Sequence, residues 1–101
     1  MASSEDKIRD LRYILQKLLS EYSPQKVILF GTQEDNDIQL LVAKRTSDRS
    51  ISRWRAIQRI LRCCTVEILV LTPWEIEYRL AIGDPFIAEI LENGEVLYPT
   101  P

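Results

Sequence analysis

This sequence has no histidine, only two cysteines and no long apolar run, and each shortage excludes a class of protein. Without histidine there is no Ser–His–Asp triad, no histidine general base and none of the usual zinc sites. Cys63 and Cys64 are adjacent, and neighbouring cysteines rarely bridge each other, so a disulfide framework is excluded and a reducing cytoplasm is expected. No apolar run approaches the roughly 18 residues of a membrane span. The polar start "MASSEDKIRD" does not resemble a secretory signal.

What is present indicates one small globular domain over residues 1–101. The composition is 46% hydrophobic and 28% charged, with a net charge of −2. The charge is unevenly spread. Residues 44–62 hold seven basic residues, Lys44, Arg45, Arg49, Arg53, Arg55, Arg59 and Arg62, against one acid, Asp48. Residues 63–101 hold seven acids against one base, Arg79. This asymmetry is explained either by a solvated helix face or by a surface that steers a partner.

Hydrophobic spacing and turn residues predict the order α-β-β-α-β-α-α-(β). The predicted helices are residues 5–22, a basic segment from "SDRSIS" to about Arg62, a stretch that begins at "TPWE", and a short one from "DPF" to "ENG". The predicted strands are "KVILF", "DIQLLVA", "TVEILVL" and, at the sheet edge, "EVLYP". In "TPWE", Thr72 is the expected N-cap, with Pro73 at the first helical position and Glu75 completing a capping box.

These elements predict an α/β fold with a small mixed sheet and flanking helices. The first two strands are separated by a short polar turn, so they should pair antiparallel as a hairpin. The connection to the third strand is long enough for a right-handed parallel crossover. In the basic helix, the residues expected on the inner face are Ile51, Trp54, Ile57, Ile60 and Leu61. Arg55, Arg59 and Arg62 are expected together on the other side.

The turn between the first two strands holds three carboxylates, Glu34, Asp35 and Asp37. They are either metal ligands of an active site or only the polar tip of a hairpin. The sequence around them bears on this choice, because it resembles a known family.

The resemblance is carried by "VILFG" with a following hydroxyl residue, by "DIQLLV", by "VEILVLTP" and by "GDPFIAEILENGEVLY". In order and spacing these segments resemble the minimal nucleotidyltransferase domains of the DNA polymerase beta superfamily. Such domains are the type paired with HEPN-domain proteins in prokaryotic toxin–antitoxin operons. The resemblance covers most of the chain and implies a nucleotidyltransferase-like fold. For an active member it also implies Mg²⁺-dependent transfer of a nucleoside monophosphate from a nucleoside triphosphate to a hydroxyl.

In that family, two carboxylates at alternate strand positions point to one face and hold two magnesium ions roughly 3.5–4 Å apart. A third carboxylate lies on the neighbouring strand. A Gly–Ser step offers backbone N–H groups and a hydroxyl to the triphosphate. By resemblance, Gly31 and Thr32 take the nucleotide-binding Gly–Ser place. Asp37, Gln39 and Glu67 take the three carboxylate places, with Asp37 and Glu67 as the metal ligands.

This chain departs from the family at two points. Gln39 supplies a neutral amide, which is a much poorer ligand for Mg²⁺ than a carboxylate. Only "QEDN" separates Thr32 from Asp37, so most of the segment that would wrap the triphosphate is missing. Asp35 and Asp37 are also spaced i, i+2, and a shifted register would make Asp35 the second metal ligand.

Three functional classes follow from these features. The first is a catalytically impaired member that binds a protein, either a HEPN-type partner in the manner of an antitoxin or another copy of itself. The second is an active nucleotidyltransferase that uses Mg²⁺ and a nucleoside triphosphate. The third is a nucleic-acid-binding module that uses the arginine-rich helix in residues 44–62. Gln39 and the short loop favour the first class over the second, and the low overall basicity disfavours the third. Trp54 and Trp74 are expected in the core or at an interface.

Overall fold

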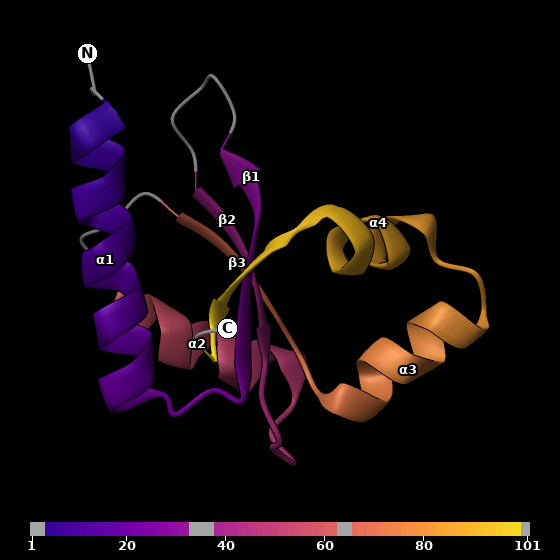
Figure 1. Ribbon diagram of the computed structural model, residues 1–101. Helices are drawn as coiled ribbons and strands as arrows, with labels where there is room; N and C mark the ends of the chain where they lie inside the picture. Colours follow the sequence, from indigo (N-terminus) through magenta and orange to yellow (C-terminus); the bar gives the residue numbers. More distant parts are fainter. Residues whose placement is uncertain (1–3, 33–37, 63–65, 100–101) are drawn as a thin grey trace.

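The computed structural model describes residues 4–32, 38–62 and 66–99 of the chain. The elements occur in the predicted order (Figure 1): α1 (Ser4–Glu21), β1 (Lys26–Thr32), β2 (Ile38–Ala43), α2 (Ser50–Ile60), β3 (Val66–Leu71), α3 (Pro73–Ala81), α4 (Pro85–Asn93) and β4 (Glu95–Tyr98). The predicted α/β class with a small mixed sheet and flanking helices is confirmed.

The sheet has the strand order β3-β2-β1-β4. β1 and β2 pair antiparallel, as predicted for a hairpin, and β3 lies parallel to β2 after the crossover through α2. β4 pairs antiparallel with β1 and forms an edge, as predicted. Pro99, which follows the strand, has no N–H to donate to a further strand. The two central strands are therefore β2 and β1.

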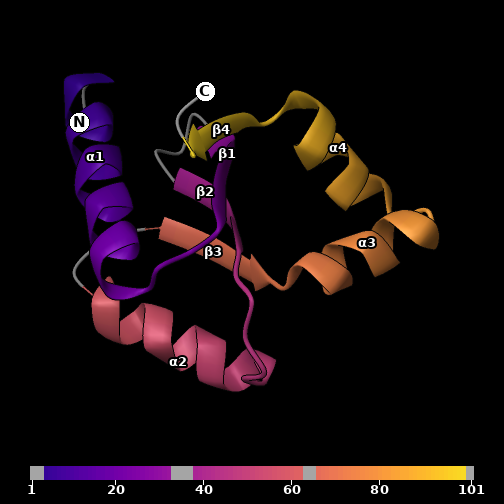
Figure 2. The ribbon, with the colours of Figure 1, turned by 60° about the horizontal axis from the view of Figure 1, so that its bottom comes forward.

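Alternate residues of the strands enter two separate apolar clusters. Leu40 and Val42 face α1 and α2, where they pack with Ile14, Leu18 and Ile57. The intervening residues of the sheet face the opposite way, toward α4. Ile28, Leu41 and Leu71 pack there with Ile87 and Ile90. Figures 1 and 2 show α1 and α2 on one side of the sheet, and α3 and α4 on the other.

The two C-terminal helices begin as the sequence predicts. The Thr72 hydroxyl accepts a hydrogen bond from the Glu75 N–H, and the Glu75 carboxylate accepts one from the Thr72 N–H, which completes the capping box. Gly83 ends the α3 segment with a φ of 78°, a conformation that costs glycine little. Asp84 then caps α4 by accepting from Phe86 and Ile87.

The basic segment 44–62 differs from the prediction in two respects. Only Ser50–Ile60 is helical, because Lys44 still bonds to Leu71 at the end of the sheet and residues 44–49 form the connection to α2. Trp54 was expected on the inner face, but its side chain is 56% exposed, and Ile51 is 51% exposed. The prediction for these two residues is wrong because Arg53, and not Trp54, lies on the inner face next to Ile57.

Arg53 is buried because each part of its guanidinium has an acceptor. Its Nε donates to the carbonyl oxygen of Asp48 at 2.9 Å, and its Nη1 donates to the carbonyl oxygen of Val70 at 3.2 Å. Nη1 and Nη2 also bond to the two carboxylate oxygens of Glu75, at 2.7 and 3.3 Å. Burial raises the pKa of Glu75, but the bonds from Arg53 and Thr72 outweigh it, so the pKa lies below its usual value. This ion pair ties α2 to the start of α3.

Some predicted residues lie outside the described part of the chain. These are the turn carboxylates Glu34, Asp35 and Asp37, and the adjacent cysteines Cys63 and Cys64. Within the described residues, no helix combines the length and the hydropathy needed to cross a membrane.

Candidate functional site

Gln39 and Glu67 lie side by side on the face of the sheet that α4 covers. They are paired in the parallel register of β2 and β3, one residue after the start of each strand. The Gln39 Nε2 donates a hydrogen bond of 2.8 Å to the Glu67 Oε2. The structure thus brings together two of the three residues that the resemblance placed in carboxylate positions.

Gly31 and Thr32, the proposed nucleotide-binding pair, end β1 next to these residues. Gly31 is opposite Gln39, and Thr32 is opposite Ile38, in the antiparallel register of the hairpin. A register irregularity lies between Leu29 and Gly31. The backbone of the Gly–Thr step is therefore adjacent in the sheet to Gln39, whereas the catalytic and metal-ligand candidates Asp37 and Asp35 are outside the described residues.

The described residues alone do not fit a two-metal centre. Glu67 is one carboxylate, and its partner is an amide that presents an N–H donor to it. A magnesium site needs several oxygen ligands, and the neutral amide oxygen of Gln39 is a much poorer one than a carboxylate. Among the residues that the structure describes, no group of three or more Asp, Glu, Cys or His is placed to hold a metal ion.

A pocket of about 460 Å³ opens beside this pair, between the sheet and α4. The strands contribute Phe30, Gln39, Glu67 and Leu69 to its lining, and α4 contributes Phe86, Glu89, Ile90 and Asn93. Phe30 and Phe86 meet edge to face across it, with ring centroids 5.6 Å apart and planes at 88°. The side chain of Asn93 donates to Glu89 at 2.9 Å.

The α4 residues of this pocket were not predicted from the sequence. The sequence does contain one signal for them. Residues 86, 89, 90 and 93 are three or four positions apart, which places them on one side of the helix that Asp84 caps. What could not be read from the spacing is the sheet face on which the helix packs. The capping residue fixed the start of α4, and the tertiary structure placed it over Gln39 and Glu67.

A second distinctive surface is the outer side of α3, which has no buried residue. Trp74 and Tyr78, one turn apart, are 55% and 65% exposed, and Ile82 after the helix is 62% exposed. Leu80 is also exposed, on another side of the helix. Figure 2 shows α3 extending away from the sheet, and the exposed fractions show that these side chains are largely open to solvent in the described chain. We call Trp74, Tyr78, Leu80 and Ile82 the α3 surface.

A third surface lies on the exposed side of α2. Arg55, Arg59 and Arg62 are exposed there, as the sequence predicted, and Trp54 is exposed among them. Arg55, Arg59 and Trp54 line one shallow depression. The arrangement combines positive charge with one aromatic ring.

Comparison with family models, with curated proteins and with solved structures finds no match for this chain. The resemblance described above therefore stays a prediction.

Proposed function

We propose that this chain is a cytoplasmic protein of nucleotidyltransferase-like fold that acts by binding another protein and not by transferring nucleotides. The α3 surface carries this proposal. Isolated apolar side chains are common on protein surfaces, but a helix with no buried residue that exposes Trp74, Tyr78, Leu80 and Ile82 is characteristic of an interaction site. Tryptophan and tyrosine are also the residues most enriched among those that dominate binding energy.

The fold supports the resemblance in its element order and strand pairing. An antiparallel hairpin is followed by a helical crossover to a parallel strand, with Gln39 and Glu67 adjacent on one face. The same pair argues for impaired chemistry. The Gln39 amide donates directly to Glu67, whereas a two-metal centre would need a negatively charged carboxylate at both positions. Losing a carboxylate ligand lowers the stabilisation of the transition state, and each 1.36 kcal/mol lost would slow nucleotide transfer about tenfold.

The expected partner is a HEPN-type protein, as in antitoxin–toxin pairs, with a second copy of this chain as the alternative. The experiment tests the purified chain alone and with the products of the genes beside it, a HEPN-type protein above all, and measures any complex by sedimentation velocity. Trp74→Ser should weaken binding by about tenfold or more, because buried interface tryptophans are frequent hot spots. Trp54→Ser is the matched control, since Trp54 is 56% exposed on a different helix, compared with 55% for Trp74.

Comparing Trp74→Ser with Trp54→Ser distinguishes binding through the α3 surface from binding through α2. A complex that is lost with Trp74→Ser and kept with Trp54→Ser supports binding through α3. Equal affinity of both variants would show that the α3 surface is not the binding site. A chain that stays monomeric and forms no complex with the HEPN-type protein would contradict the binding function itself.

An active nucleotidyltransferase is the second candidate, favoured by the position of Glu67 beside Gln39 at the pocket. Transfer of labelled nucleotide to protein or RNA acceptors, with Mg²⁺ or Mn²⁺, tests it. We expect no transfer, and Gln39→Asp should restore little because the phosphate-binding loop remains short. Robust transfer that Glu67→Ala or Asp37→Ala abolishes would establish a compact active site. Asp35→Ala would then be as damaging as Asp37→Ala.

Nucleic-acid binding is the third candidate and rests on the exposed arginines of the α2 side. If Arg55, Arg59 and Arg62 contact phosphates, affinity must fall steeply with salt, and each arginine-to-alanine change must flatten that slope by about one unit. We expect no complex at physiological salt. A sub-micromolar complex under those conditions would place this candidate first.

A further inference from the structure

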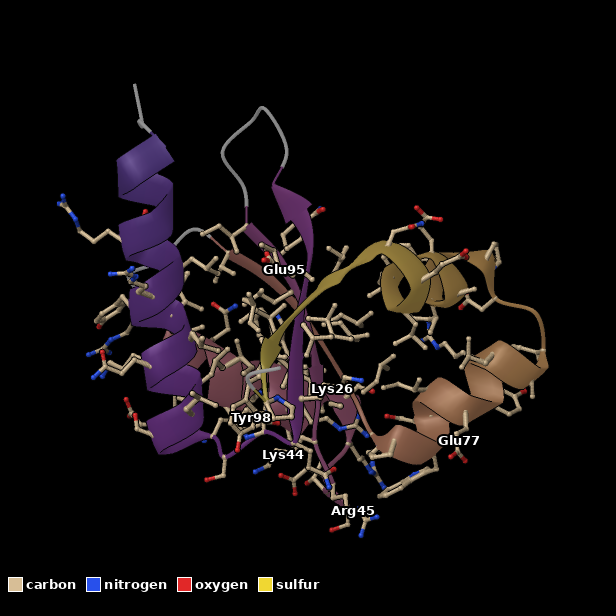
Figure 3. All side chains as sticks on the ribbon, viewed as in Figure 1. Lys26, Lys44, Arg45, Glu77, Glu95 and Tyr98 are labelled. Atoms are coloured by element: carbon tan, nitrogen blue, oxygen red, sulfur yellow. The ribbon has the colours of Figure 1, made fainter. Side chains whose placement is uncertain are left out.

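The pocket between the sheet and α4 has a lining of uniform charge sign. Of its lining residues only Glu67 and Glu89 are charged, and no lysine or arginine lines it within the described chain. The basic residues Lys26, Lys44 and Arg45 lie at the other end of the sheet, away from the start of β2 (Figure 3). An anionic group such as phosphate would therefore meet two carboxylates and no cationic side chain in this lining; Arg62 lines the neighbouring depression that Glu67 also borders.

Neither carboxylate has a cationic partner among the described residues. The ion pairs there join Lys17 to Glu21, Arg53 to Glu75, and Arg79 to Asp84. Glu67 and Glu89 instead accept hydrogen bonds from the neutral amides of Gln39 and Asn93. A carboxylate has about four acceptor sites, so each retains acceptor capacity as well as its negative charge.

The rest of the lining is apolar and aromatic. Phe30 and Phe86 hold an edge-to-face arrangement at the pocket, with Leu69 and Ile90 beside them. A volume of about 460 Å³ lies within the usual range for small-molecule sites, which combine an apolar wall with a few polar groups that set orientation. Aromatic faces attract cations as well as apolar groups.

We propose that this pocket binds a small organic cation, an amidinium, guanidinium or ammonium group carried on a flat or short apolar body. The cationic group would bond to Glu67 and Glu89, and the body would contact the phenylalanine rings. This site is distinct from the α3 surface, because Trp74, Tyr78, Leu80 and Ile82 do not line the pocket. The proposal therefore does not depend on partner binding.

The test uses three probes of one shape and different charge: benzamidinium, benzamide and benzoate. Binding to the ¹⁵N-labelled chain is followed by NMR titration at low salt, where fragments of this size are expected to bind with a Kd in about the millimolar range. Benzamidinium should bind about two- to fivefold more tightly than benzamide, and benzoate should bind more weakly than either. Shifts should concentrate on β2, β3 and α4.

Carboxylate variants identify the source of the preference. Glu67→Gln and Glu89→Gln should each weaken benzamidinium binding by about two- to fivefold and leave benzamide unchanged. Glu92→Gln is the matched control, because Glu92 is exposed on α4 and does not line the pocket. Glu67 and Glu89 are both exposed, so these variants should remain folded.

Three results would overturn the proposal. Benzamide binding as tightly as benzamidinium would mean that the pocket selects only for apolar shape. Benzoate binding most tightly would assign the site to anions. Benzamidinium binding that neither Glu67→Gln nor Glu89→Gln weakens would mean that the two carboxylates do not set the preference.

Discussion

Replacing Arg53 by methionine should strongly destabilise this protein, although the change lies on a helix that is exposed along most of its length. Methionine keeps the unbranched apolar stem and removes the guanidinium, which donates to two carbonyl oxygens and to both oxygens of Glu75. The Arg53 side chain is 8% exposed and that of Glu75 34%, so the pair lies at the boundary between core and solvent. The lost bonds connect α2 to β3 and to the first turn of α3.

The size of the effect follows from the groups left behind. Breaking a buried ion pair by removing one partner costs about 3–5 kcal/mol. Here the lower end applies, because Glu75 is partly exposed and still accepts the Thr72 N–H at 2.7 Å. We expect a loss of about 3 kcal/mol in the free energy of unfolding, which corresponds to a fall in Tm of about 12–24 °C for a domain of this size.

Urea unfolding monitored by circular dichroism measures this loss, together with a double-mutant cycle. Glu75→Gln keeps an acceptor but removes the counter-charge. The pair Arg53→Met and Glu75→Gln should therefore cost less than the sum of the single changes, with a coupling of about 1–3 kcal/mol. Arg55→Met is the matched control on the exposed side of the same helix, and should change stability by no more than about 0.5 kcal/mol. If Arg53→Met is as stable as Arg55→Met, the reasoning is refuted.

Three further predictions concern the same C-terminal half. The pKa of Glu75 is lower in the folded chain than in the unfolded chain, so the ionised carboxylate contributes to the free energy of unfolding. That contribution is full above the unfolded-state pKa and is lost as the pH falls through the folded-state pKa. Urea midpoints at pH 7 and pH 3 should therefore differ less in Glu75→Gln than in the unmodified chain. Thr72→Ala removes the capping hydroxyl and should cost about 1 kcal/mol in urea unfolding, whereas Thr72→Ser should keep most of it. Gly94→Ala places a Cβ 2.5 Å from both the Ile28 Cγ2 and the Ile90 carbonyl oxygen, and should cost about 1–3 kcal/mol; an unchanged Tm would show that α4 shifts freely against β1.

The element order was predictable because its signals are local. Apolar residues at alternate or helical spacing set the strands and helices, and turn and capping residues set their ends. Thr72 with Glu75 and Asp84 with Pro85 marked the starts of α3 and α4, and the structure contains both caps. The short turn after Thr32 was enough to predict an antiparallel hairpin, because so few residues allow no other pairing.

The inner side of α2 was predicted incorrectly because its signal is not local. Hydrophobic spacing favoured Trp54 as a core residue, and it is Arg53 that is buried. Burial of a guanidinium is favourable only when every part of it meets an acceptor, and those acceptors come from Asp48, Val70 and Glu75, as much as 22 residues away in the sequence. The spacing of apolar residues contains no information about such a set.

The sequence by itself determined the order of the elements and their caps, whereas the resemblance to nucleotidyltransferases, with Gln39 in place of a carboxylate, stays a prediction. Only the tertiary structure decided that the Gln39 amide bonds directly to Glu67, that α4 closes a pocket of negative charge over this pair, and that α3 leaves its aromatic residues uncovered. The physical reason is that local spacing fixes which side chains share a face of one element. Which faces meet is decided by how the whole chain buries its apolar area and satisfies its polar groups.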